Sequence, residues 1–117
     1  MAHSELQELR QQLADFARAR DWEQFHSPKN LSMALAVEAA ELLEIFQWQT
    51  EQQTREADEQ TRARVAEELA DILLYSLQLS DRLGIDLLQA AQAKLIRNGE
   101  KYPADQVRGS ARKYTEY

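Results

Sequence analysis

The sequence predicts an all-α protein folded as a single four-helix bundle-like domain over residues 1–117. Apolar residues recur at helical spacing in four stretches, and the chain has only three Gly and two Pro. With 44% hydrophobic residues it is too apolar for disorder, and it is too poor in turn-forming residues for a β-sandwich or barrel. A chain of this length forms one domain by default. We expect its core over about residues 4–103, with a C-terminal tail, 104–117, for which nothing predicts order.

The first two predicted helices are separated by a proline. The first is expected from about Ser4, its N-terminal cap, to Arg20, with an apolar stripe formed by Leu6, Leu9, Leu13 and Phe16. It ends before Pro28, because a proline cannot continue a helix and the residue before it favours extended backbone. The second helix is expected from about Asn30 to Gln49.

The third and fourth predicted helices are separated by a glycine. The third is expected over about Glu56–Leu83, where Gly84 provides a left-handed cap. Asp86 then caps a fourth helix that reaches about Glu100.

The third helix is apolar over an unusually wide arc between Leu69 and Leu79. A helix that is apolar on both sides must be covered on both sides, which one small chain cannot easily do. We therefore expect a homo-oligomer, a homodimer or homotetramer, with this helix near the subunit interface. The alternative is a central helix buried within the monomer.

Charge balance and cysteine content exclude several classes of protein. Asp and Glu number 20 against 14 Lys and Arg, a net charge of −6, which argues against nucleic acid as the main partner. The absence of Cys excludes disulfide-stapled modules, cysteine-ligated zinc modules and thiol enzymes. No apolar run approaches the roughly 20 residues that span a bilayer, and no leader pattern is present. We expect a cytoplasmic protein without a membrane partner.

Two of the predicted helices each carry a pair of carboxylates beside an apolar stripe. On the second helix Glu38 occupies a core position, and Glu41 follows three residues later on the same face. Glu68 and Asp71 repeat this spacing on the third helix. One such pair is common on solvated helix faces, but two pairs in core register on successive helices are rare.

These pairs predict a metal site. An ionised carboxylate in apolar surroundings costs several kcal/mol unless it is paired or bound to a cation. Only Arg62 and Arg64 precede the second pair, and no base occurs between residues 30 and 49. Oxygen ligands select a hard divalent ion, Mg²⁺ or Mn²⁺. Iron and zinc are disfavoured because neither His3 nor His26 has ligand spacing and Cys is absent. The alternative is an ordinary solvated acidic face.

Further motifs extend over roughly Leu6 to Pro103. They are Arg20–His26 (RDWEQFH), Glu38-x-x-Glu41 followed by Phe46–Trp48 (FQW), Glu68-Leu69-x-Asp71 with Tyr75, and Lys94, Asn98 and Lys101–Pro103. Together they resemble the all-α MazG-like nucleoside triphosphate pyrophosphohydrolases, and within that family the dCTP pyrophosphatase branch. One residue departs from the common pattern, because Val37 stands where many MazG-like proteins have a second, adjacent glutamate. The dCTP-type branch tolerates that change.

The resemblance implies hydrolysis of a (deoxy)nucleoside triphosphate, dCTP or a modified dCTP, to the monophosphate and pyrophosphate, as a step in nucleotide-pool cleaning. It also implies Mg²⁺ held by Glu38, Glu41, Glu68 and Asp71. A bound metal makes physical sense because an acidic protein binds a triphosphate only if metal ions invert the local field. The attacking water is activated by a second Mg²⁺ or by one of the carboxylates. Among these we select Glu41 as the candidate catalytic group, because it lies at the edge of the apolar stripe.

The nucleoside requires side chains of another kind. Trp22 and Trp48 can both stack on a base; spacing alone favours a core role for them, whereas the resemblance favours stacking. Tyr75 lies one turn beyond Asp71 and could pack against the sugar. His26 lines the nucleotide pocket or only braces its loop.

The fourth predicted helix carries a candidate phosphate-binding face. Lys94, Asn98 and Lys101 lie at i, i+4 and i+7, and the resemblance extends this set to Tyr102. The alternative is a solvated basic face.

Two other functions compete with nucleotide hydrolysis. One is a non-enzymatic helical dimerisation or adaptor module whose carboxylates form intersubunit salt bridges. The other, a metal-dependent nuclease, is weakened by the net negative charge and by the lack of a long basic surface.

Overall fold

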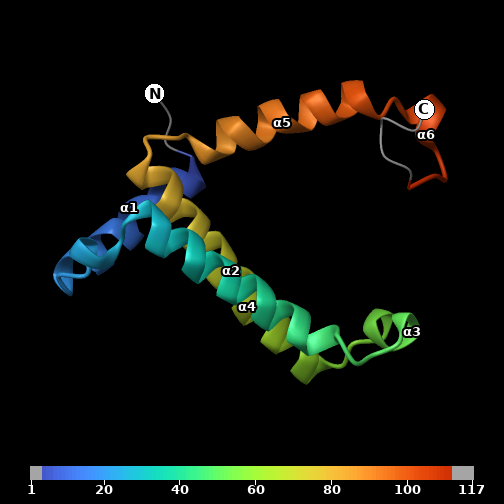
Figure 1. Ribbon diagram of the computed structural model, residues 1–117, viewed down its shortest axis with the longest axis horizontal. Helices are drawn as coiled ribbons and strands as arrows, with labels where there is room; N and C mark the ends of the chain where they lie inside the picture. Colours follow the sequence, from blue (N-terminus) through green and yellow to red (C-terminus); the bar gives the residue numbers. More distant parts are fainter. Residues whose placement is uncertain (1–3, 112–117) are drawn as a thin grey trace. The chain divides into compact units, whose positions relative to one another are not determined.

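The computed structural model describes residues 4–111, and all regular structure within that range is helical (Figure 1). The predicted all-α class is confirmed. The described chain forms two compact units that meet in sequence after Gly84. The first contains α1 (Glu5–Ala19), the 3₁₀ turn η1 (Glu23–Phe25), α2 (Pro28–Phe46), α3 (Glu51–Arg55) and α4 (Glu59–Arg82). The second contains α5 (Leu87–Lys101) and α6 (Ala104–Val107).

Helix α1 begins at the predicted cap and ends in a left-handed turn. Ser4 and Gln7 exchange hydrogen bonds of 3.1 Å between side chain and backbone N–H, which satisfies two free donors of the first turn. At the other end Asp21 has a positive φ of 55°, and the N–H of Trp22 donates to the carbonyl of Ala17 at 3.0 Å. Side-chain oxygens let Asp tolerate this backbone region better than most residues do. The turn places Trp22 directly after the helix.

Helix α2 begins earlier and ends earlier than predicted. Pro28 does not delay the helix but occupies its first turn, where a missing N–H costs nothing, and Ser27 accepts from the N–H of Asn30 at 3.1 Å. The predicted end at Gln49 is wrong, because the helix stops at Phe46 and the N–H of Gln49 turns back to the carbonyl of that residue at 2.9 Å. Trp48 therefore lies in a turn.

The third predicted helix starts too early. A separate short helix, α3, forms first, because Thr50 and Gln53 exchange capping hydrogen bonds. α4 then begins at Glu59, where Asp58 accepts from the N–H of Thr61 at 2.8 Å. The cap at Asp58 thus moves the start of the helix from residue 56 to residue 59.

The second unit follows the predicted boundaries and adds one helix. Gly84 has a φ of 66°, the expected left-handed cap, and Asp86 accepts from the N–H of Gln89 at 3.0 Å to begin α5. The tail, for which the sequence predicted no order, contains the single turn of α6 after Pro103. Residues 112–117 of that tail lie outside the described residues, as does His3.

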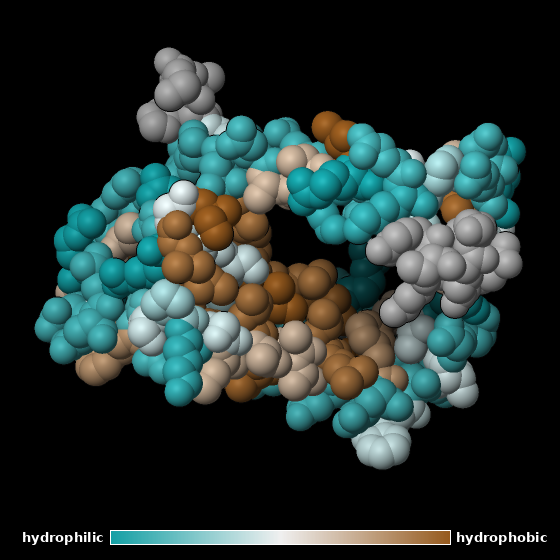
Figure 2. Space-filling view, turned by 45° about the horizontal axis from the view of Figure 1, so that its top comes forward, coloured by the Kyte–Doolittle hydropathy of each residue, from teal (hydrophilic) through white to brown (hydrophobic). Residues whose placement is uncertain are grey.

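Packing in the first unit centres on α4. Helix α2 runs beside α4 in the opposite direction, and α1 packs against the second half of α4 (Figure 1). The buried apolar side chains are Ala17, Leu31, Ile45 and Leu77. Apolar residues also remain exposed along the α2–α4 pair (Figure 2), among them Met33, Val37, Leu43, Leu69 and Leu73. None of the helices described between residues 4 and 111 combines the length and hydropathy needed to cross a membrane.

Candidate metal centre and adjoining pocket

Three glutamates from two helices lie together where α2 runs beside α4. Carboxylate oxygens of Glu38, Glu41 and Glu68 all lie within 4.8 Å of one another. The i, i+3 spacing places the first two on one face of α2, and the antiparallel packing brings the third from α4. We call these three residues the acidic cluster. Asp71, the fourth predicted ligand, lies one turn along α4 from Glu68 and is half-buried.

The acidic cluster is poorly satisfied by protein groups. The Oε2 atoms of Glu38 and Glu68 are buried and have no hydrogen-bond partner. Within residues 4–111, no Lys or Arg forms an ion pair with these glutamates or with Asp71. Leaving buried carboxylate oxygens unpaired is unfavourable, and a hard cation takes oxygen ligands of this kind. The donor set therefore fits Mg²⁺ or Mn²⁺.

Asp71 and Tyr75 interact electrostatically with the acidic cluster. Contact with the neighbouring carboxyl of Glu68 raises the pKa of Glu38 to about 7, and burial and the charges of Glu41 and Asp71 add to that rise. Burial also raises the pKa of Tyr75, followed in size by the negative charges of Glu38, Asp71 and Glu41. Asp71 and Tyr75 therefore both lie within the electrostatic field of the site.

The two tryptophans differ in their surroundings. The ring of Trp22 is 46% exposed and meets Phe16 edge-on at a centroid distance of 5.8 Å. The guanidinium of Arg20 covers that phenylalanine ring at 3.6 Å from its centroid. Trp48, in the turn after α2, is 89% exposed. Neither is a core residue, the role that spacing alone favoured.

The predicted phosphate-binding residues lie in the second unit. Lys94, Asn98 and Lys101 belong to α5, and Tyr102 caps its C-terminal end, where its N–H donates to the carbonyl of Asn98 at 2.9 Å. Their role towards phosphate stays a prediction.

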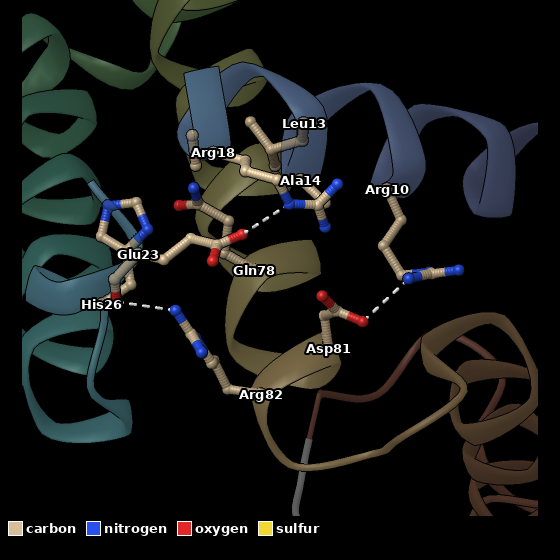
Figure 3. Close-up of a pocket in the computed structure, with 10 residues that line it drawn as sticks. Arg10, Leu13, Ala14, Arg18, Glu23, His26, Gln78, Asp81 and Arg82 are labelled. Carbon is tan, nitrogen blue, oxygen red and sulfur yellow. Dashed lines mark hydrogen bonds and ion pairs between the residues drawn. The ribbon is translucent and has the colours of Figure 1, made fainter. Parts of the chain in front are cut away.

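A pocket of about 110 Å³ lies between α1, η1 and the end of α4 (Figure 3). We call it the α1–α4 pocket. His26 lines it, and whether this residue contacts a nucleotide or only braces its loop stays open. Other side chains on its wall were not predicted: Arg10, Arg18, Glu23, Gln78, Asp81 and Arg82.

Most charges in the α1–α4 pocket are paired. Arg10 contacts Asp81 at 2.8 Å and Arg18 contacts Glu23 at 3.5 Å. Arg82 donates to the backbone carbonyl of Glu23 at 2.7 Å. Gln78 was recognisable in the sequence as a polar residue in an apolar stretch, seven residues after Asp71 and so on the same helix face. The arginines had no such local signal, because their partners are distant in sequence.

Fold and site together define an all-α protein with a candidate centre for a divalent cation. The model of the MazG-like family matches residues 33–117, and this chain belongs to that family.

Named relatives agree with this assignment. The chain is 45% identical to dCTP pyrophosphatase 1 from Mus musculus and to dCTP pyrophosphatase 1 from Homo sapiens, in each case over 95% of its own length. It spans 66% of the length of both, somewhat less than two thirds. The crystal structure of a pyrophosphatase from Archaeoglobus fulgidus superposes with a TM-score of 0.80 at 39% identity, covering 88% of this chain and 96% of the other.

Proposed function

We propose that this protein hydrolyses a (deoxy)nucleoside triphosphate, dCTP or a modified dCTP, to the monophosphate and pyrophosphate, and so cleans the nucleotide pool. The observation that carries the proposal is the acidic cluster with its two buried, unpartnered carboxylate oxygens. The names of the relatives, dCTP pyrophosphatase and pyrophosphatase, support the reaction and the substrate.

The cation belongs to the proposal. Glu38, Glu41, Glu68 and Asp71 would hold Mg²⁺, with Mn²⁺ as a substitute. A bound divalent ion supplies Lewis-acid polarisation of a phosphoryl oxygen and neutralises charge on the pyrophosphate that leaves.

Among the acidic residues, Glu41 is the candidate for orienting or deprotonating the attacking water. It is the exposed member of the acidic cluster, whereas Glu38 and Glu68 are half-buried. Its exposure leaves the Glu41 carboxylate accessible to the water that would attack.

The remaining residues have proposed roles along the nucleotide. Tyr75 would contact the sugar, because it lies one turn along α4 from Asp71. The exposed rings of Trp22 and Trp48 offer stacking surfaces for a base, and His26 lines the α1–α4 pocket. Phosphate binding by Lys94, Asn98, Lys101 and Tyr102 is proposed from their sequence motif alone.

We also propose a homo-oligomer, a dimer or a dimer of dimers. The exposed apolar side chains along α2 and α4 give a second copy of the chain an apolar surface to cover (Figure 2).

Incubation of the purified protein with each dNTP and Mg²⁺ tests the reaction. Pyrophosphate is the expected direct product, and orthophosphate as the direct product would contradict the proposal. Glu38→Ala should abolish turnover, whereas Glu56→Ala, on the exposed surface, should leave it unchanged.

The same samples separate an enzyme from an adaptor module. Mg²⁺ at about 100 times its Kd should stabilise the wild-type protein by about 2.7 kcal/mol, measured as a higher melting temperature. An adaptor whose carboxylates only form salt bridges predicts no such increase and no turnover.

A further inference from the structure

One polar stripe runs along α4 from the acidic cluster to the α1–α4 pocket. Glu68, Asp71, Tyr75, Gln78 and Arg82 follow one another at alternating spacings of three and four residues, so they share one helix face. Glu68 belongs to the acidic cluster, and Asp71 raises the pKa of Glu38 in it. Gln78 and Arg82 line the α1–α4 pocket. From Asp71 to Gln78 the helix rises by about 10 Å, seven residues at about 1.5 Å each.

Gln78 differs from the arginines of the α1–α4 pocket because its amide is unpaired. The side chain is half-buried, and Figure 3 shows it beside Glu23, His26 and Arg18. No hydrogen bond involves its amide within the described range, residues 4–111, whereas the arginines around it are engaged. An amide carries two donors and one acceptor group, and those of Gln78 are not among the buried polar atoms, so a ligand that enters the pocket can reach them. The amide is therefore available to a ligand in this pocket, as is the imidazole of His26, which also has no hydrogen bond among the described residues.

The size of the pocket limits the ligand. A volume of about 110 Å³ is smaller than the roughly 150 Å³ cavity that accommodates benzene in another protein, so the pocket suits part of a single six-membered ring. A bicyclic purine would leave more of its surface outside.

We propose that Gln78 is a specificity-determining residue, whose amide hydrogen-bonds the edge of a pyrimidine base in the α1–α4 pocket. This inference rests on the proposed function, which puts the phosphates at the acidic cluster. The order along α4 then matches the order along a nucleotide: carboxylates for the metal-bound phosphates, Tyr75 for the sugar and Gln78 for the base. Cytosine presents an amino donor next to a ring-nitrogen acceptor, and a glutamine amide complements both at once.

Two substitutions at Gln78 test the role. Gln78→Met keeps the length of the side chain and removes its hydrogen bonds, so it should lower kcat/KM for dCTP about ten-fold and for dATP much less. Gln78→Glu offers only acceptors when ionised, so it should retain more activity with dCTP, which has the amino group, than with dTTP. Gln60→Met is the matched control, the same change at an exposed position of the same helix.

Binding of the products provides a second readout that needs neither metal nor turnover. Calorimetric titration of dCMP, dTMP and dAMP should reproduce the kinetic pattern of each variant. Gln78→Met should weaken the binding of dCMP more than that of dAMP, and Gln78→Glu should weaken the binding of dTMP more than that of dCMP. A melting curve verifies that each variant is folded. Losses of equal size for all bases, or no loss in either variant, would overturn the role of Gln78. Gln78-dependent base selectivity in binding without pyrophosphate release would instead overturn the proposed reaction and retain Gln78 as a base-binding residue. If the wild-type protein neither binds these nucleotides nor releases pyrophosphate from any dNTP, both proposals fail.

Discussion

The acidic cluster and the α1–α4 pocket lie on the same face of α4 and handle charge in opposite ways. In the pocket each arginine has a partner, such as Asp81 for Arg10 at 2.8 Å. In the cluster, carboxylates face one another, and two buried oxygens have no hydrogen-bond partner. Both regions are rich in charged residues, so the number of charges does not distinguish them. What distinguishes them is whether the charges are paired, and the unpaired set marks where the protein needs a cation.

The largest expected effect comes from removing one charge of the cluster. Glu68→Gln should lower kcat/KM by more than about 100-fold. Removing a residue that only orients a metal ligand costs up to about 100-fold, and Glu68 is proposed as a ligand itself. Glu67→Gln, the adjacent residue on the exposed surface, is the matched control and should retain wild-type activity. Pyrophosphate release under saturating Mg²⁺ measures both. Equal losses in the two variants would mean that the position in the cluster is irrelevant.

A smaller effect is expected from pH in the metal-free protein. The pKa of Glu38 rises from 4.5 to about 7 on folding, so the folded state binds its proton more tightly than the unfolded state does. The resulting stability is fully present below about pH 4.5 and is lost as the pH rises through about 7. The urea midpoint measured in EDTA should therefore fall between about pH 5 and 8, and less so in Glu38→Gln.

Mg²⁺ should reverse that trend, because its ligands must be deprotonated. The increase in melting temperature on adding Mg²⁺ should be larger at pH 8 than at pH 6. A pH-independent increase would contradict a cation held by Glu38.

The smallest effect is expected in the pocket. Arg10 and Asp81 are 36% and 42% exposed, and ion pairs of this exposure contribute less than about 1 kcal/mol. A double-mutant cycle of Arg10→Ala and Asp81→Ala, followed by urea unfolding, should give a coupling energy in that range. A coupling energy of several kcal/mol would contradict this expectation, because it would make the exposed Arg10–Asp81 pair a major contributor to the free energy of unfolding.

The acidic residues could be predicted from sequence because helical spacing is a local property. Glu38 and Glu41, or Glu68 and Asp71, are neighbours on any regular helix that contains them. Only the packing of two apolar stripes was then needed to bring one pair beside the other. The same reasoning predicted the left-handed cap at Gly84.

Other features depended on information that is not local. The contact between Arg10 and Asp81 joins residues 71 positions apart, so the composition of the α1–α4 pocket required the packed fold. Two helix starts differ from the prediction for another reason. Pro28 begins α2, because proline is favoured in a first turn. Caps at Thr50 and Asp58 begin α3 and α4 as separate helices.

The left-handed turn at Asp21 fixes Trp22 to the last turn of α1, against Phe16. Trp48, by contrast, stands almost fully in solvent. The protein thus carries two intrinsic fluorophores with different environments, and they are its only tryptophans. Trp48 is open to a dissolved quencher, whereas Trp22 is partly shielded by the ring of Phe16. The two rings can therefore be told apart by their accessibility to a quencher, without any added label.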